Sequence, residues 1–242
     1  MQIAPANPAR GIDKFKENRR ERFLTGGELE RLGRAIREAE TIGIPWTVNE
    51  SKASAKHVPK SERSTKIAAA AASALRLLLF TGCLLREILH LRGEHVDFER
   101  GCLFWPDSKS GRKTVILNAP ALAVLNGMNP VGPYVVPGDD PDQPRHDLKR
   151  PWDAVTKRAG LTGVRLHDLR HTYASFGAGG GLGLPIIGRL LGHAQAATTA
   201  RYAHLDNDPL RRASEAIAGR IATALQGKRT ASVTALTKRR TA

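Results

Sequence analysis

Apolar residues recur at helical spacing soon after the start of the chain. Thr25 and Glu28 stand three positions apart, the arrangement of a capping box in which each side chain accepts a hydrogen bond from the other residue's backbone N–H. Apolar residues then follow three or four apart as far as Ile36, which predicts an amphipathic helix beginning at Thr25. Residues 41–66 lack this periodicity and contain two prolines, so we expect an extended surface connection there.

Two more helices are expected in the apolar centre of the chain. Residues 67–80 are almost entirely apolar, which predicts a buried helix that ends at Gly82. A second helix is expected over residues 84–91, because apolar residues at i, i+4 and i+7 from Leu84 lie on one face. On this stripe alone, Leu84 is interpreted as a core residue.

Strand signals are confined to one short region. Residues 102–105 and 114–117 have the length and composition of strands. Residues 107–113 between them are rich in serine, glycine and charged side chains, which favour a turn. Together they predict an antiparallel hairpin with Lys109 at its tip.

The rest of the chain is predicted to be helix and loop. Helices are expected over residues 121–126, 151–159, 167–176, 185–191, 197–204 and 209–225. The glycine-rich residues 177–183 are interpreted as a flexible link. The predicted fold class is α+β, mainly α: a helical bundle with a small antiparallel β-sheet. We expect one domain over residues 23–225, preceded by a linker or basic arm (1–22) and followed by a disordered basic tail (226–242).

The charge of the chain changes the picture from fold to partner. Its 38 Lys and Arg against 23 Asp and Glu give a net charge of +15 at pH 7. Such an excess is typical of proteins that bind a polyanion, because neutralising phosphates releases counterions. A polyanion such as a nucleic acid is therefore the expected partner, and a basic protein without a nucleic-acid role is the alternative.

Cysteine content and hydropathy exclude other classes. Cys83 and Cys102 form no CxxC pair and are typical of a reducing compartment. The longest apolar run, residues 68–80, is interrupted by Ser73 and Arg76 and is shorter than the ~20 residues of a membrane span. The N-terminus has no signal-peptide pattern, so a cytoplasmic protein is predicted.

Candidate chemistry is concentrated in the last third of the chain. His167 and Arg170 stand at i and i+3 of a predicted helix, so they share a face. Phosphoryl transfer requires cations on the phosphate oxygens and a group that moves protons, and an arginine can bind two oxygens at once. A solvated polar helix face is the alternative interpretation of these two residues.

Three other residues gain meaning only in combination. His193 follows a predicted helix that Pro185 opens and Gly192 closes, which is also the position of a capping histidine. Tyr202 is a weak nucleophile by itself, since a tyrosine has a reference pKa of about 10, and most such residues are half-buried in a core. Lys109 could reach a leaving-group oxygen or be an exposed turn lysine.

The order of these motifs resembles one family. HDLRH at 167–171, LLGH at 190–193 and TTARYAHL at 198–205, preceded by the lysine hairpin, resemble the tyrosine recombinase (phage integrase) family. The pairs TG at 81–82 and REI at 86–88 and the run DPLRRA at 208–213 fall in the same order. The resemblance spans about residues 22–225 and implies the tyrosine recombinase catalytic-domain fold.

The resemblance also implies a reaction and a role for each residue. Tyr202 would be the nucleophile that cleaves DNA through a 3′-phosphotyrosyl link and releases a 5′-hydroxyl. Lys109 would protonate that oxygen, Arg170 and His193 would hold the non-bridging oxygens, and His167 would assist proton transfer. No metal or cofactor is implied, because the covalent bond conserves the phosphodiester energy. Other recombinase protomers on DNA are expected partners, through a C-terminal helix at residues 209–225 acting in trans.

The chain departs from the family pattern at one catalytic position. The pattern T-G-x-R-x-x-E reads Thr81-Gly82-Cys83-Leu84-Leu85-Arg86-Glu87 here, so the first catalytic arginine is replaced by Leu84. Arg86 cannot replace it if both residues are helical, because two positions turn a helix by about 200°. The resemblance also implies an N-terminal domain that clamps the DNA, and we expect that domain to be absent here. The alternative to an active integrase is thus a catalytically impaired DNA-binding relic.

Other classes explain fewer of these features. Residues 90–95 have one residue too many for an H-x-x-E-H zinc motif, and no H-E-x-x-H occurs. The glycine-rich segment lacks the Lys-Ser/Thr of a phosphate-binding loop. A helix-turn-helix regulator would account for charge and helicity, yet not for the lysine hairpin or the tyrosine spacing. Site-specific DNA recombination or integration is the function that we expect.

Overall fold

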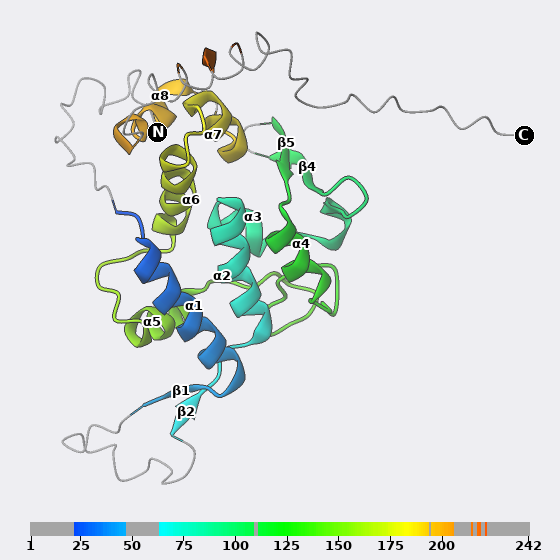
Figure 1. Cartoon of the computed structure of the whole chain (residues 1–242). Coiled ribbons are helices and arrows are strands. Elements are labelled where there is room, and N and C mark those ends of the chain that lie inside the picture. The colour runs from blue at the N-terminus through cyan, green and yellow to red at the C-terminus, as the bar shows by residue number, and fades with distance from the viewer. Residues whose placement is uncertain are drawn as a thin grey trace, which may run out of the picture.

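The computed structural model describes residues 22–46, 63–108, 111–193 and 195–205, with Ser214, Ile217, Ala218 and Ile221 (Figure 1). The α-helices of residues 22–205 are α1 (Gly26–Thr41), α2 (Ala69–Thr81), α3 (Leu85–Leu89), α4 (Ala119–Asn126), α5 (Lys149–Arg158), α6 (His167–Gly179), α7 (Leu184–Leu191) and α8 (Ala196–Ala200). The strands are β1 (Ile44–Pro45), β2 (Ser64–Thr65), β3 (Val96–Asp97), β4 (Cys102–Ser108) and β5 (Gly111–Ile116). Short 3-10 helices cover Gly93–His95 and Ala203–Leu205. The predicted α+β, mainly α class is confirmed.

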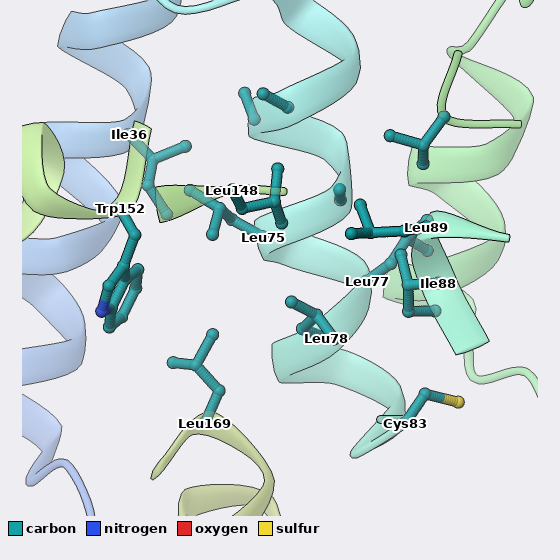
Figure 2. Packing of buried hydrophobic residues seen from close by; sticks show 14 of the residues in the cluster. Ile36, Leu75, Leu77, Leu78, Cys83, Ile88, Leu89, Leu148, Trp152 and Leu169 are labelled. Carbon is teal, nitrogen blue, oxygen red and sulfur yellow. The ribbon is translucent and has the colours of Figure 1, made fainter. Parts of the chain in front are cut away.

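Helix α2 is the central element of the fold. Its alanines and leucines are buried on nearly all sides, and it contacts α1, α3, α4, α5 and α6. Figure 2 shows its leucines between Trp152 of α5 and Ile88 and Leu89 of α3. The helix ends where Gly82 takes a left-handed conformation, with φ of +64°. A Cβ there would lie 2.7 Å from the Tyr173 ring, so both backbone and space require glycine.

Helix α1 begins as its sequence predicts. The Thr25 hydroxyl accepts from the Glu28 backbone N–H at 3.3 Å, and Glu28 accepts from the Thr25 N–H at 2.9 Å. The segment before the helix is tied to α6, because the buried Leu24 donates its N–H to the Thr172 hydroxyl. The N-terminal segment therefore fixes the helix that carries the candidate site.

The hairpin is tighter than predicted. Pairing between β4 and β5 continues to Ser108 and Gly111, so Lys113 lies within a strand and not in a seven-residue turn. An irregularity between Trp105 and Ser108 accommodates Pro106, which has no N–H to donate. Strand β3 adds a short antiparallel edge, giving the order β3-β4-β5. A separate two-residue ladder, β1 with β2, lies in the region expected to be only extended connection.

The helix predicted over residues 84–91 is present but shorter than predicted. Helix α3 covers only Leu85–Leu89, because Leu84 is its extended N-cap residue and donates its N–H to the Glu87 carboxylate at 2.8 Å. Leu84 is 42% exposed, so the interpretation of this residue as core is wrong. Ile88 and Leu91 are fully buried, as the stripe predicts.

A second, smaller hydrophobic cluster lies at the α6–α7 end. It consists of Ala174, Ala178, Ile187, Leu191 and Tyr202. Helix α6 runs three residues further than predicted, so part of the supposed glycine link is helical and brings α6 close to α7. The connection that remains is residues 180–183. The predicted helix over residues 197–204 is right only as far as Ala200, where α8 ends; Tyr202 lies in a turn before the 3-10 helix.

Several predictions fall outside the described residues. Lys109 at the hairpin tip, the arm at residues 1–21, the tail at 226–242 and most of the helix expected over 209–225 stay untested. Of that last segment, Ser214, Ile217, Ala218 and Ile221 are helical. None of the helices in the described part of the chain combines the length and hydropathy needed to cross a membrane.

Candidate active site

Arg170 joins the two hydrophobic clusters. Its guanidinium donates to the backbone carbonyl of Gly82 at 2.5 Å and to that of Leu191 at 2.8 Å. The residue is 7% exposed and its pKa is lowered by burial, although an arginine stays charged at physiological pH. One buried cation thus fixes the end of α2 against the end of α7.

His193 is placed by a glycine turn. Gly192 closes α7 with φ of +71°, and the half-buried His193 follows it, as the sequence predicts. The Thr199 hydroxyl lies 2.8 Å from Nδ1 of His193. Burial, with the charges of Arg170 and Lys113, lowers the pKa of His193 to about 4. The ring is therefore neutral, and a hydroxyl that donates to Nδ1 leaves the proton on Nε2 as a donor.

Tyr202 is buried within its own chain. It is 5% exposed, and its ring packs in the small cluster. Its hydroxyl lies 2.6 Å from Nδ1 of His171, one turn of α6 beyond His167. Burial raises the pKa of Tyr202, while the charges of Arg201 and Arg170 act in the opposite direction. The hydroxyl is therefore protonated near neutral pH.

The rings of the two histidines of α6 contact each other. The rings of His167 and His171 lie edge to face, with centroids 4.7 Å apart. Desolvation and the charge of Arg170 lower the pKa of His167. Burial and the neighbouring His167 lower the pKa of His171 to about 4. Both rings are neutral at physiological pH and can accept a proton.

A partly buried ion pair supports the same region from the sheet. Lys113 Nζ lies 2.5 Å from Glu87 Oε1 and 5.9 Å from the centre of the Trp105 ring. A Cβ added to Gly192 would lie 2.9 Å from Lys113 Cε, so the lysine side chain passes directly against the turn that carries His193. Glu87 also caps α3, so it connects the hairpin, the α2–α3 corner and the histidine turn.

The sequence identified most of this site but not all of it. Hydrogen bonds hold the predicted residues in one region: Arg170 binds the Leu191 carbonyl, His193 pairs with Thr199, and Tyr202 pairs with His171. His167 contacts His171. Sequence reasoning assigned no role to His171, Lys113, Thr199 or Glu87. The i, i+4 spacing of His167 and His171 was the available signal for His171. The other three are placed by tertiary contacts.

The α2–α3 corner has no cation at position 84. Leu84 lies exposed at the start of α3 where the family pattern has an arginine. Arg86 is exposed and its guanidinium lies 3.3 Å from Nε2 of His90. In the described part of the chain, no three His, Cys, Asp or Glu side chains are close enough to hold a metal ion together. The groups present can orient an oxyanion, donate to it and exchange protons.

The chain belongs to the phage integrase family, whose sequence pattern matches residues 52–208. It is 31% identical over 150 residues to the integrase of Salmonella phage P22, covering 55% of this chain and 38% of that protein. It is 27% identical over 197 residues to the tyrosine recombinase XerA of Pyrococcus furiosus, covering 78% of this chain and 66% of that protein. The chain is thus a tyrosine recombinase catalytic domain by sequence.

Solved structures show the same fold. XerH site-specific recombinase bound to palindromic difH substrate, in a post-cleavage complex, matches with a TM-score of 0.58 and 20% identity, over 81% of this chain and 53% of that one. The catalytic domain of bacteriophage HP1 integrase matches with a TM-score of 0.52 and 19% identity, over 86% of this chain and 98% of that domain. The chain spans between 20% and 66% of the length of the curated relatives that it matches here.

Proposed function

We propose that this chain cleaves and rejoins double-stranded DNA in site-specific recombination or integration, with Tyr202 as the nucleophile. The observation that supports this most directly is the placement of Tyr202: its hydroxyl is buried against His171, close to the turn of His193 and in the field of Arg170. Since the tyrosine packs against α6 and α7 of its own chain, the proposed cleavage occurs in cis.

Each role follows from the chemistry of its residue. Tyr202 attacks the scissile phosphate and forms a 3′-phosphotyrosyl link, which releases a 5′-hydroxyl. Arg170 has N–H groups beyond the two that bind carbonyls, and with His193 Nε2 it holds the non-bridging oxygens. His167 assists proton transfer and Lys109 protonates the leaving oxygen. The glutamate–lysine pair of Glu87 and Lys113 supports the His193 turn.

A nicked suicide substrate tests the proposal. Duplexes drawn from the DNA that flanks the coding sequence are incubated with the chain, and covalent adducts are separated on a denaturing gel. We expect an adduct that disappears in Tyr202→Phe, which keeps the aromatic packing and loses the hydroxyl. If the wild-type chain and Leu84→Arg both bind DNA and neither forms an adduct, the proposal is contradicted.

The exposed Leu84 supports a second candidate, a catalytically impaired DNA-binding relic. A preorganised donor of this kind contributes about a hundred- to a thousand-fold in rate, so its loss could abolish detectable cleavage. Because Leu84 is exposed, an arginine fits there without displacing core residues. An adduct from Leu84→Arg and none from the wild-type chain would establish the relic.

Binding itself is expected to depend on salt. With a net charge of +15, the chain should neutralise several phosphates and release their counterions. The logarithm of the DNA affinity should fall linearly and steeply with the logarithm of the salt concentration, measured by fluorescence anisotropy. A flat response would contradict DNA as the partner.

We also propose that the C-terminal helix docks onto a neighbouring protomer on DNA. Two helical isoleucines, Ile217 and Ile221, are exposed at i and i+4. An apolar groove with a volume of about 400 Å³ offers a site of matching chemistry on a second copy. Its lining includes Leu29, Leu79, Phe80, Phe176, Leu182 and Leu190.

The trans contact has its own test. Ile217→Asp with Ile221→Asp should prevent assembly of several protomers on one DNA, followed by native gels and sedimentation. The single-protomer complex should persist, because both side chains are exposed in the isolated chain. Unchanged assembly would contradict this contact and leave the cleavage proposal standing.

A further inference from the structure

His171 lies closer to the nucleophile than its sequence position suggests. Its Nδ1 is 2.6 Å from the Tyr202 hydroxyl, and both side chains are buried. The family-based roles give proton transfer to His167, whose ring contacts His171 edge to face. The group that touches the reacting oxygen in this structure is therefore one helical turn beyond the expected one.

We propose that His171 is a catalytic residue: its Nδ1 orients the Tyr202 hydroxyl and accepts its proton as the oxygen attacks phosphorus. This inference rests on the proposed function, because it assigns a step within that reaction. A neutral phenol is a good donor and an unprotonated imidazole nitrogen a good acceptor, so the hydroxyl donates and Nε2 carries the ring proton.

The surroundings hold His171 in the required form. The backbone of α6 fixes the ring position, and the edge-to-face contact with His167 restricts its rotation. Burial lowers the pKa of His171 to about 4, so Nδ1 is unprotonated near neutral pH. A proton acceptor that is neutral, buried and hydrogen-bonded to its donor needs no rearrangement before the step.

The charges that face His171 explain when it takes the proton. His167 and the cations Arg165 and Arg201 disfavour a protonated ring, while the buried Asp168 on the same helix acts in the opposite direction. Arrival of a DNA phosphate adds negative charge beside these groups, and the attack adds more. The proton affinity of His171 should therefore rise as the reaction proceeds.

The step balances in both directions. The O–H bond of Tyr202 breaks and its proton moves to Nδ1, giving an imidazolium. The tyrosine oxygen forms the bond to phosphorus while the bond from phosphorus to the 5′-oxygen breaks, and that oxygen receives a proton from Lys109 in the proposed scheme. On rejoining, the 5′-hydroxyl attacks phosphorus and its proton returns to Lys109, while the bond from phosphorus to the tyrosine oxygen breaks and that oxygen recovers its proton from His171.

The hydrogen bond can be tested without DNA. The chain has three tyrosines, so labelling their Cζ carbons with ¹³C gives three signals, of which Tyr202→Phe identifies one. We expect His171→Leu to shift the Tyr202 signal and its titration, and imidazole ¹⁵N spectra to show His171 as the Nε2–H tautomer. An Nδ1–H tautomer, or a Tyr202 signal insensitive to His171→Leu, would overturn the proposal.

The proposed proton transfer to His171 is tested by cleavage kinetics. The parent for these measurements is whichever of the wild-type and Leu84→Arg chains forms the adduct. His171→Leu should lower the single-turnover cleavage rate by about 10²- to 10⁴-fold. His171→Asn keeps an acceptor near the position of Nδ1 without its basicity, so its rate should keep rising with pH where the parent rate is level.

The matched control is His146→Asn, since His146 is exposed and lies outside the site. It should leave both the rate and its pH profile unchanged. If the cleavage rate of His171→Asn depends on pH in the same way as that of its parent chain, His171 has only a structural role and the proposal is overturned. Absence of an adduct in both parent chains would overturn the catalytic step together with the function, while the spectra would still report on the hydrogen bond.

Discussion

The two sides of the candidate site differ in how many polar and charged side chains they contribute. The α6–α8 side carries Arg170, His171, His193 and Tyr202, each buried or half-buried and hydrogen-bonded. The α2–α3 corner keeps its framework, with the left-handed Gly82 and the Glu87 cap, but presents the exposed Leu84. The corner still contributes to the site, because the Gly82 carbonyl accepts from the arginine of the other side.

This difference separates architecture from electrostatics. A backbone carbonyl and a helix cap do not depend on the side chain at position 84, so the corner can lose its cation and keep its shape. On the α6–α8 side, the same side chains hold the helices together and supply the charged and hydrogen-bonding groups of the site. A substitution at position 84 should therefore affect activity alone, whereas substitutions of the buried side chains on the α6–α8 side should affect activity and stability together.

Arg170→Lys should have the largest effect. A lysine keeps the charge but cannot bind both carbonyls, and it loses the planar grip on a phosphate. Cleavage should fall by about 10³-fold or more, and the free energy of unfolding by about 2–3 kcal/mol. Adduct formation and urea denaturation measure the two effects. Arg86→Lys, at an exposed position, is the control that should change neither.

Leu84→Arg should change activity without changing stability. Restoring a donor should raise the cleavage rate by about 10²- to 10³-fold, while the free energy of unfolding stays within about 0.5 kcal/mol. Ile42→Arg adds the same charge at an exposed apolar residue at the far end of α1 (Figure 1) and controls for a general gain in DNA affinity. Equal rates in the two variants would remove the distinction between the sides.

Gly188→Ala should destabilise the α6–α8 side. A Cβ at Gly188 would lie 2.8 Å from the Thr199 hydroxyl, so either Thr199 rotates away from His193 or α8 moves. We expect a loss of about 1–3 kcal/mol in the free energy of unfolding. Gly33→Ala, in the interior of α1 with room for a methyl, should instead gain up to about 1 kcal/mol. Adding Thr199→Ala to Gly188→Ala should recover part of the loss; full additivity would contradict the contact.

Mild acid should also lower the free energy of unfolding, through the histidines of the α6–α8 side. His171 and His193 have pKa values of about 4 in the fold, against an ordinary value of about 6.5. Between these values the unfolded chain binds more protons, so the free energy of unfolding falls as pH drops from about 6.5 toward 4. Urea midpoints at pH 7, 6 and 5 should decline, and His193→Asn should flatten the decline. The Glu28 carboxyl, with a pKa of about 2, contributes to pH dependence only below about 4.5.

The sequence predicted the framework better than the contacts. Capping at Thr25, the stop at Gly82 and the turn at Gly192 were all predicted, because local chemistry determines them. The exposure of Leu84 was not predicted, because the Glu87 carboxylate caps the helix at that residue. The end of the helix before Tyr202 was not predicted either, because packing of Tyr202 in the small cluster overrides helical periodicity there. Contacts between distant segments, such as Lys113 with Glu87, leave no local pattern.

The small cluster has a further consequence for how the molecule moves. Tyr202 packs with Ala174, Ala178, Ile187 and Leu191, apart from the main core around α2. A cluster of so few apolar side chains can open as a local unit at a lower free energy than global unfolding. Amide hydrogens of α7 and α8 should therefore exchange faster than those of α2. Tyr202, the proposed nucleophile, would then lie in the part of the fold that opens first, while α2 and its neighbours stay folded.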